Sequence, residues 1–286
     1  MNGWLVYCRE DAAKNRPYID MFFAQGERRG IAFSLLYLEE LETLREEEKT
    51  VFLYQGNRLP LPDLAVNRSR SLGLSLALEG AGIRVFNNST VTLIGNDKPA
   101  ALTFAKHLGL PVLRTFPLME DNPKEALGKL LSREKELVLK TIDGHGGSEV
   151  FWVKENGPWE ELLSRFQGRS LIAQEPADTL GRDLRVYVTG GRILTAVLRK
   201  SDTDFRSNFS LGGSIEIHTL TDEERAMAEK MIQALAPDHC GVDFLYHKGH
   251  PVFSELEDVV GSRMLYTHTD IDAVDGYVDW ISRSVL

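Results

Sequence analysis

The chain is organised around the stretch Gly241-Val-Asp-Phe-Leu-Tyr-His-Lys-Gly-His-Pro-Val-Phe-Ser-Glu-Leu-Glu257. Two short apolar runs flank a turn at Gly249, a pattern that predicts a hairpin. If Gly249 is the centre of an odd-numbered loop, Asp243 faces Glu255, and Glu257 follows on the same face because strand side chains alternate with period 2. Three carboxylates on one patch repel one another unless a cation neutralises them. Oxygen ligands without Cys or paired His favour a hard ion, Mg²⁺ or Mn²⁺, over zinc.

The same stretch has a simpler interpretation. Acidic residues that alternate with apolar ones often form the solvated face of a half-buried sheet. The hairpin alone leaves both interpretations open, so the rest of the chain has to distinguish them.

Composition restricts the class of protein. The chain has 286 residues, 43% of them apolar and 26% charged, which is typical of globular proteins and allows two to three subdomains. A net charge of −9 disfavours nucleic acid and anionic membranes as partners. Cys8 and Cys240 lie far apart in apolar runs, which favours buried thiols over a disulfide. Without a signal-peptide pattern or an 18-residue apolar run, we expect a cytoplasmic protein.

The first 90 residues alternate between strand and helix patterns, which predicts a small α/β layer domain. The strand-like runs are 2–8, 31–38, 51–54 and 64–67, and the helix-like runs are 18–29 and 41–49. Arg68 and Arg70 follow the last of these strands. Ligands gather at the carboxyl ends of strands in open α/β sheets, so both arginines are candidate substrate contacts, with surface arginines as the alternative.

Two lysines and a glycine-rich loop lie in the middle of the chain. Lys98 stands where a helix running to His107 begins, and a helix N-terminus favours anions. Lys140 ends the apolar strand 136–140, and a buried strand needs a reason to carry a lysine. The loop that follows has glycines suited to close approach of backbone N–H groups to phosphate. These are Gly144, Gly146 and Gly147.

The last third contains further turn and helix signals. Gly190-Gly191 predicts a tight hairpin turn, and Thr221-Asp-Glu-Glu224 is a capping box that begins a helix. A polar loop at 204–213 carries Arg206 and Asn208. A last amphipathic helix is expected from about Ile271.

In this order and spacing, the chain resembles the ATP-grasp superfamily, and within it the RimK-type group of α-L-glutamate ligases. The resemblance rests on Lys98, Val138-Leu-Lys140, Gly144–Gly147, Gln174-Glu-Pro176, Asp183-Leu-Arg185, Phe205-Arg-Ser-Asn208, Gly241-Val-Asp243 and Glu255-Leu-Glu257. It implies an ATP-grasp fold of mixed α/β and α+β class. A pre-ATP-grasp α/β domain would span 1–95, a small lid subdomain 96–180 and a C-terminal subdomain with the metal site 181–286.

The resemblance also implies roles for individual residues. Phosphates would be held by Lys98, Lys140, the loop glycines Gly144, Gly146 and Gly147, and Arg206, Ser207 and Asn208. Glu175 and Pro176 would meet adenine, and Asp183 would contact the nucleotide. Asp243 and Glu255 would bind metal, with Glu257 in the place where the family usually has Asn. Arg206 would neutralise charge on the transferring phosphoryl group. Arg199, near the end of an apolar strand directly before the Arg206 loop, would stabilise either that group or the tetrahedral oxyanion.

The implied activity is an ATP- and Mg²⁺-dependent ligation. A carboxylate would be activated as an acyl phosphate and joined to an amine of an amino acid or peptide. Small-molecule or peptide substrates would lie near several arginines, namely Arg16, Arg68, Arg70, Arg199 and Arg263. Homo-oligomers are a tendency of the family. The alternatives are an ATP-grasp kinase acting on another acceptor and a nucleotide-sensing protein whose turnover Glu257 has weakened.

Overall fold

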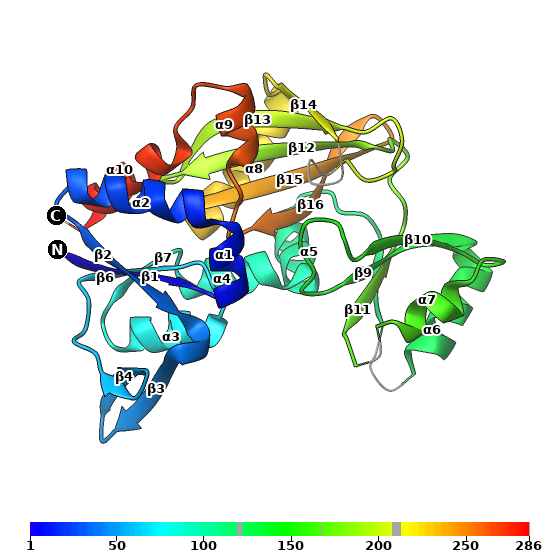
Figure 1. The fold of residues 1–286 in the computed structure, drawn as a ribbon. Helices are drawn as coiled ribbons and strands as arrows, with labels where there is room; N and C mark the ends of the chain where they lie inside the picture. The colour runs from blue at the N-terminus through cyan, green and yellow to red at the C-terminus, as the bar shows by residue number, and fades with distance from the viewer. Residues whose placement is uncertain (119–121, 167, 208–212, 286) are drawn as a thin grey trace.

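The structure of the protein is a computed structural model that describes residues 1–118, 122–166, 168–207 and 213–285. Within these residues the strands form four sheets, seen as separate layers in Figure 1. The helices are α1 (Arg9–Lys14), α2 (Arg16–Arg28), α3 (Leu72–Gly80), α4 (Ser89–Asn96), α5 (Lys98–His107), α6 (Pro123–Glu134), α7 (Trp159–Ser164), α8 (Asp222–Leu235), α9 (Arg263–His268) and α10 (Ala273–Ser284). A short 3₁₀ turn spans Leu38–Glu40.

The strands fall into four groups in chain order. The first group comprises β1 (Asn2–Tyr7), β2 (Ala32–Tyr37), β6 (Leu64–Asn67) and β7 (Arg84–Phe86), and the second β3 (Leu41–Glu46), β4 (Lys49–Tyr54) and β5 (Asn57–Arg58). The third comprises β8 (Thr115–Leu118), β9 (Glu136–Thr141), β10 (Val150–Lys154) and β11 (Leu171–Gln174). The fourth comprises β12 (Arg182–Thr189), β13 (Arg192–Lys200), β14 (Ser214–Ile217), β15 (His239–His247) and β16 (His250–Glu257).

The N-terminal sheet is parallel, with the order β2-β1-β6-β7. Its central strand β1 is buried on both faces, as expected for a parallel sheet covered by helices. Trp4 and Val6 pack in one core with α3, whereas Leu5 and Tyr7 pack in another with α2 and α10. The predicted α/β layer therefore forms, and it places the residues after β6 at the carboxyl edge of the sheet.

The C-terminal helix α10 returns to this N-terminal layer and lies against α2 (Figure 1). The rings of Phe22 and Tyr277 meet edge to face at 5.8 Å, and Arg29 forms an ion pair of 2.7 Å with Asp275. The domain boundaries expected at 95/96 and 180/181 stay predictions. Through α10 the first and last of those segments share one core.

The prediction of a helix-like segment at 41–49 is wrong. Residues Leu41–Glu46 form β3, which pairs with β4 across a turn where Glu47 has φ 55°. Glu, Leu and Arg are good helix formers, but helix propensity differs by only tenths of a kcal/mol per residue, and cross-strand pairing with the partly buried strand β4 outweighs it. The resulting hairpin projects from the N-terminal layer (Figure 1).

The third sheet is antiparallel, with the order β10-β9-β11-β8. Its apolar side packs with α6 and α7 around Leu127, Leu139 and Val153. This small layer carries Lys140 on β9 and the glycine-rich loop between β9 and β10. Lys140 and the glycine-rich loop, both linked to phosphate by the sequence, therefore belong to the same small layer.

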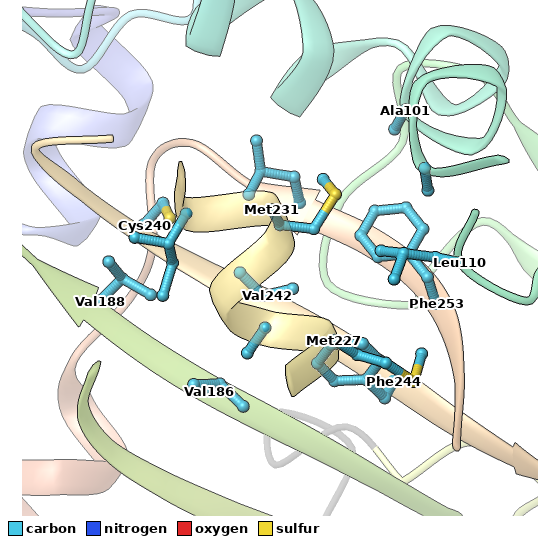
Figure 2. Close-up of a cluster of buried hydrophobic side chains, with 14 of the residues drawn as sticks. Ala101, Leu110, Val186, Val188, Met227, Met231, Cys240, Val242, Phe244 and Phe253 are labelled. Atoms are coloured by element: carbon cyan, nitrogen blue, oxygen red, sulfur yellow. The ribbon is translucent and has the colours of Figure 1, made fainter. Parts of the chain in front are cut away.

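The largest sheet is antiparallel, with the order β14-β13-β12-β15-β16. Figure 2 shows Met227 and Met231 of α8 lying over Val186, Val242 and Phe244 of the sheet. The capping box that begins α8 is present as predicted. Because strand side chains alternate, the neighbours of these apolar residues face the opposite side of the sheet, where the charged residues gather.

The hairpin of β15 and β16 has the predicted pairing for a different reason. The loop has only two residues, Lys248 and Gly249, with φ values of 54° and 79°, which is typical of a tight primed turn. A bulge next to Asp243 then shifts the register by one residue, so that Asp243 pairs with Glu255. The expected odd-numbered loop was wrong, and the bulge compensates for it.

Two other local features complete the fold. Gly190 and Gly191 both have positive φ, 59° and 68°, which confirms the predicted tight turn between β12 and β13. The last helix begins at Ala273, and the short helix α9 precedes it, which the sequence did not predict. Among the described residues, every helix is too short or too polar to cross a bilayer.

Candidate active site

Two cavities meet at the centre of the molecule. The first, of about 500 Å³, lies between the N-terminal layer, α9 and the charged face of the large sheet. The second, of about 110 Å³, lies between the small sheet and the large sheet. Both are lined by Lys98, His145, Gly146 and Glu255, so the two cavities adjoin at these residues.

Most of the residues predicted to hold nucleotide line the second cavity. They are Lys98, Lys140, Gly144, Gly146, Gly147, Glu175, Asp183, Arg206 and Ser207. Asn208 lies outside the described residues. Pro176 is absent from the walls of both described cavities, and it follows Glu175 directly.

Lys140 projects from β9 into the second cavity. Its Nζ donates to Gln174 Oε1 at 2.7 Å, and Gln174 in turn donates to Thr115 Oγ1 at 2.8 Å. Burial lowers the pKa of Lys140 to about 8, and the charge of Lys98 adds to this effect while Glu255 opposes it. The positive charge of Lys140 is therefore held at a cost in free energy that a bound anion would reduce.

Lys98 joins helix α5 to the glycine-rich loop. Asp97 caps α5 by accepting from the backbone N–H of Ala100 at 2.8 Å, which places Lys98 in the first turn. The Lys98 ammonium donates to the backbone oxygens of Ile142 and Gly144. Helix N-terminus, lysine and loop thus converge on one point, as expected for an anion site.

The glycine-rich loop requires glycine at specific positions. Gly146 and Gly147 have φ values of 68° and 77°, a region that other residues enter only with strain. A Cβ on Gly144 would collide with the side chains of Thr141 and Glu149. Arg206 of the large subdomain donates to the backbone oxygen of Gly147 at 2.9 Å, so the loop is tied to the opposite wall of the cavity.

A buried charge network crosses the large sheet. Arg185 donates to both oxygens of Asp243 at 2.8 and 2.7 Å and also contacts Glu257. Arg199 donates to Asp243 at 2.7 Å and forms a second ion pair with Asp183. Strand register accounts for two of these pairs, because Arg185 lies opposite Asp243 and Asp183 lies opposite Arg199 on adjacent strands. The other two contacts reach across one intervening strand.

The two arginines determine the charge state of Asp243. Burial opposes ionisation of Asp243, but Arg185 and Arg199 outweigh it and lower the pKa of its carboxyl to about 2. Ser207 donates to Asp183 at 2.8 Å, which connects the network to the Arg206 loop. Asp243 is therefore ionised and held by two arginines on the wall of the second cavity.

Glu255 and Glu257 differ from Asp243 in their partners. Within the part of the chain that the structure describes, Glu255 forms no ion pair, and it lines both cavities. Burial raises the pKa of Glu257, and the nearby Asp243 and Glu255 carboxylates contribute, against the opposing effect of Arg185. A divalent cation between Glu255 and Glu257 would relieve this repulsion, and oxygen donors suit Mg²⁺.

The three predicted metal carboxylates are close, but Arg185 intervenes. Among the described residues, no group of three or more His, Cys, Asp and Glu side chains is arranged to hold a metal ion. Arg185 and Arg199 occupy the oxygens of Asp243. Glu255 and Glu257 therefore fit a cation better than Asp243 does, and the predicted set of three stays a prediction.

The first cavity receives three of the five arginines expected near substrate. Arg68, Arg199 and Arg263 line it. Arg16 instead pairs with Asp20 on an exposed helix face, and Arg70 pairs with Asp11. Neither Arg16 nor Arg70 lines the described cavities.

Sequence reasoning missed several residues that line the first cavity. Arg185 was quoted only as part of a motif, although an arginine in the apolar strand β12 carries the same signal as Lys140 in β9. His145 stands within the glycine-rich loop, and burial with the charges of Arg70 and Lys98 lowers its pKa to about 4. Tyr18 and Ser262 gave no signal, because they reach the cavity only through packing.

Fold and cavities together define a class of protein. The small and the large antiparallel sheets enclose the second cavity, whose lysines and glycine-rich loop suit phosphate. The N-terminal α/β layer completes the first cavity beside it. This is the arrangement expected of an ATP-grasp enzyme, and comparison with known proteins identifies the group.

The chain belongs to the RimK-like ATP-grasp domain family, whose sequence profile matches residues 115–281, well over half of the chain. It is 28% identical over 245 residues to a probable alpha-L-glutamate ligase of Vibrio parahaemolyticus, covering 81% of this chain and 80% of that protein. A probable alpha-L-glutamate ligase of Vibrio atlanticus is 26% identical over 275 residues, covering 91% and 90%. These matches confirm the predicted family.

Solved structures confirm the predicted fold. A RimK domain ATP-grasp protein from Sphaerobacter thermophilus superimposes with a TM-score of 0.72 at 19% identity, covering 100% of both chains. The ATP-grasp ligase PsnB, complexed with minimal precursor, Mg and ADP, superimposes with a TM-score of 0.69 at 18% identity, covering 99% of this chain and 97% of that one. The chain is an ATP-dependent ligase that forms C–N bonds, and ATP and Mg²⁺ are the cofactors of that class.

Proposed function

We propose that the protein uses ATP to activate a carboxylate as an acyl phosphate and then joins it to the amine of an amino acid or peptide. One observation carries the proposal. The basic first cavity adjoins the nucleotide cavity at Lys98, His145, Gly146 and Glu255. A carboxylate in the first cavity would thereby approach the terminal phosphate of a nucleotide in the second.

The residues of the second cavity take the nucleotide. Lys98 and Lys140 hold phosphate oxygens, and Arg206 with Ser207 holds the triphosphate end, with Asn208 added from the predicted set. Gly144, Gly146 and Gly147 form a cover that excludes water. Glu175 and Pro176 lie at the adenine end, where the Glu175 carboxylate already accepts from the backbone N–H and Nε of Arg114, each at 2.8 Å.

Glu255 and Glu257 would hold Mg²⁺, or Mn²⁺ in its place, with Asp243 as the third predicted ligand. When bound, the ion neutralises charge on the phosphates during transfer. The protein residues do the rest by position and charge. Lys98 and Lys140 orient the phosphates, and the Glu255 side chain lies where both cavities meet.

Arg199 would stabilise the transferring phosphoryl group from the sheet side. Its Nε and one terminal nitrogen hold Asp183 and Asp243, which fixes the plane of the guanidinium. Its remaining nitrogen forms no ion pair with a described side chain, and the residue lines the first cavity. Arg199 is thus a preorganised donor, whereas the charge of Arg206 is partly neutralised by its ion pair with Asp204 at 2.7 Å.

The substrates are proposed by class. The named relatives are probable alpha-L-glutamate ligases, and glutamate is accordingly the first amino acid to test. The ATP-grasp ligase PsnB has been solved in complex with a precursor peptide, which adds peptides to the test set. A cytoplasmic location and a homo-oligomeric state, neither of which bears on this chemistry, stay predictions from the sequence.

An ADP-release screen tests the proposal. Amino acids and peptides are supplied singly and in pairs with ATP and Mg²⁺. Release that requires both a carboxylate and an amine supports ligation, whereas release with a single acceptor would identify a kinase instead. Nucleotide binding without any release would favour a protein whose turnover has been weakened.

A further inference from the structure

We propose that Arg68 and Ser262 form a subsite in the first cavity for the α-carboxylate of an amino acid or peptide substrate. This carboxylate is not the reacting one and survives the reaction. The inference rests on the proposed function for the identity of the ligand as a substrate. The evidence for an anion at this point is independent of that function.

Arg68 is a buried cation for which the described part of the chain supplies no carboxylate counterion. The side chain is 5% exposed and follows β6 at the carboxyl edge of the parallel sheet. One terminal nitrogen donates to the backbone oxygen of Val260 at 3.1 Å, and the other reaches Tyr18 Oη at 3.4 Å. Its Nε has no hydrogen-bond partner, and no acidic side chain among the described residues forms an ion pair with it.

A buried charge without a partner is costly, because desolvation is not offset by attraction. Asp258 is an acidic residue close enough for its charge to interact with Arg68, but its oxygens accept from Asn87 and Asn96 at 2.8 and 3.1 Å instead. Tyr18 places its ring 4.4 Å from the guanidinium carbon, which offsets part of the cost but leaves the positive charge in place. An anion entering the first cavity would supply the missing counterion.

Ser262 provides a second polar group on the same cavity wall. It is 2% exposed, and its Oγ has no hydrogen-bond partner within the described chain. The backbone oxygen of Val260, two residues before Ser262, accepts from Arg68. The Arg68 side chain therefore lies against the segment that carries Ser262. A guanidinium and a hydroxyl together suit a carboxylate, which accepts hydrogen bonds on both oxygens.

The rest of the cavity indicates the size and character of the ligand. Apolar and aromatic side chains of Tyr18, Met21, Met264 and Tyr266 line it beside Arg68. A volume of about 500 Å³ accommodates an amino acid or a short peptide. Glu257 lines the same cavity, and Glu255 lines it where it meets the nucleotide site. An amino acid whose carboxylate is bound at Arg68 would therefore direct its other end toward the reacting centre.

The test compares amino acids with their α-carboxamides, which keep the shape and remove the charge. L-alanine, L-glutamate, L-phenylalanine and their α-amides are titrated into the full-length protein with ADP and Mg²⁺, and binding is measured by calorimetry. We expect at least one free acid to bind about 10- to 100-fold more tightly than its amide. Equal affinity for acid and amide throughout the panel would overturn the subsite.

Arg68→Met should abolish this preference without lowering the melting temperature of the ligand-free protein, because it removes a buried charge that no carboxylate among the described residues pairs with. Arg16→Met is the matched control, since Arg16 is exposed and paired with Asp20. If Arg68 were only structural, Arg68→Met would melt earlier while a preference for the acid remained. If Arg68→Met does not fold, Arg68→Lys is the second variant, because it keeps the positive charge and loses the paired N–H donors of the guanidinium. Lys should reduce the acid preference while retaining the fold, and an unchanged preference would overturn the assignment.

The failure of this subsite can be separated from the failure of the proposed function. Binding is read without turnover, so an acid preference in a protein that joins no substrates would support the subsite and refute the ligase. Where an active pair is known, amidating one substrate at a time identifies which of the two is held. Ligation that is insensitive to both amidations would keep the ligase and refute the subsite.

Discussion

Arg185 and Arg199 differ from Arg68 in what offsets their charge. All three guanidinium groups are at least nine-tenths buried and line the first cavity. The two arginines of the large sheet each contact two carboxylates, whereas Arg68 contacts only backbone and tyrosine. A buried charge that is paired within the chain contributes to the fold. A buried charge left without a carboxylate partner is available for a ligand.

The largest effect is expected from Asp243→Asn. The substitution removes the carboxylate that Arg185 and Arg199 share, so we expect the free energy of unfolding to fall by about 3 kcal/mol, together with the loss of ADP release. Urea denaturation and an ADP assay measure the two effects. Asp20→Asn removes an exposed pair and should cost no more than about 0.5 kcal/mol. Equal costs for both substitutions would remove the basis for treating the network as structural.

Glu255→Gln should separate activity from stability. Because Glu255 forms no ion pair within the described chain, the free energy of unfolding should stay within about 0.5 kcal/mol of the wild type. ADP release should fall about 100-fold or more, since the side chain lies where the two cavities meet. A Mg²⁺ titration of the remaining activity shows whether metal affinity is lost. Full activity at low Mg²⁺ would exclude Glu255 as a ligand.

The charge of Arg68 also acts on His239, which stacks on Tyr277 with ring centroids 4.5 Å apart. Burial, with the charge of Arg68, lowers the pKa of His239 to about 3, while Thr189 Oγ1 lies 2.9 Å from Nδ1. The unfolded chain binds this proton near its ordinary pKa of about 6.5, so the contribution to stability is complete above that pH and falls as the pH approaches 3.

His239→Gln should therefore make the protein less sensitive to acid. Between pH 7 and pH 5 the wild type should lose about 2 kcal/mol more of its free energy of unfolding than the variant. Chemical denaturation at the two pH values measures the difference. Arg68→Met should leave this loss unchanged, because burial remains the main cause of the low pKa of His239 and the folded-state pKa stays well below pH 5. Parallel losses in the wild type and His239→Gln would show that His239 is already protonated or accessible in the fold.

The sequence predicted the chemical groups of the site better than their partners. Lys140 was recognisable because a lysine in an apolar strand is unusual, and Asp243 and Glu255 because they alternate with apolar residues. The pairing of Arg185 with Asp243 joins strands 58 residues apart and depends on register, which local patterns do not encode. The lack of a carboxylate partner for Arg68 among the described residues is likewise a property of the assembled cavity.

Local preference was misleading where long-range pairing decided the structure. The segment 41–49 has the composition of a helix and became a hairpin because β4 supplies a buried partner. The loop around Gly249 was expected to have an odd length, and the bulge near Asp243 restored the predicted pairing. Both cases depend on contacts between strands, whereas the capping box at Thr221 is local and was predicted correctly.

The smallest effect is expected from Glu257→Asn, which restores the residue that the family usually carries. Glu257 contacts Arg185, but Arg185 keeps both of its bonds to Asp243 in the variant, so the network should persist. Because burial and the neighbouring carboxylates raise the pKa of Glu257, removing its charge costs little stability. We expect ADP release within about tenfold of the wild type, since Glu255 remains as a metal ligand in the variant. Total loss of activity with intact stability would mean that Glu257 and Arg185 act together on the substrate, and the paired network would then belong to catalysis as well as to the fold.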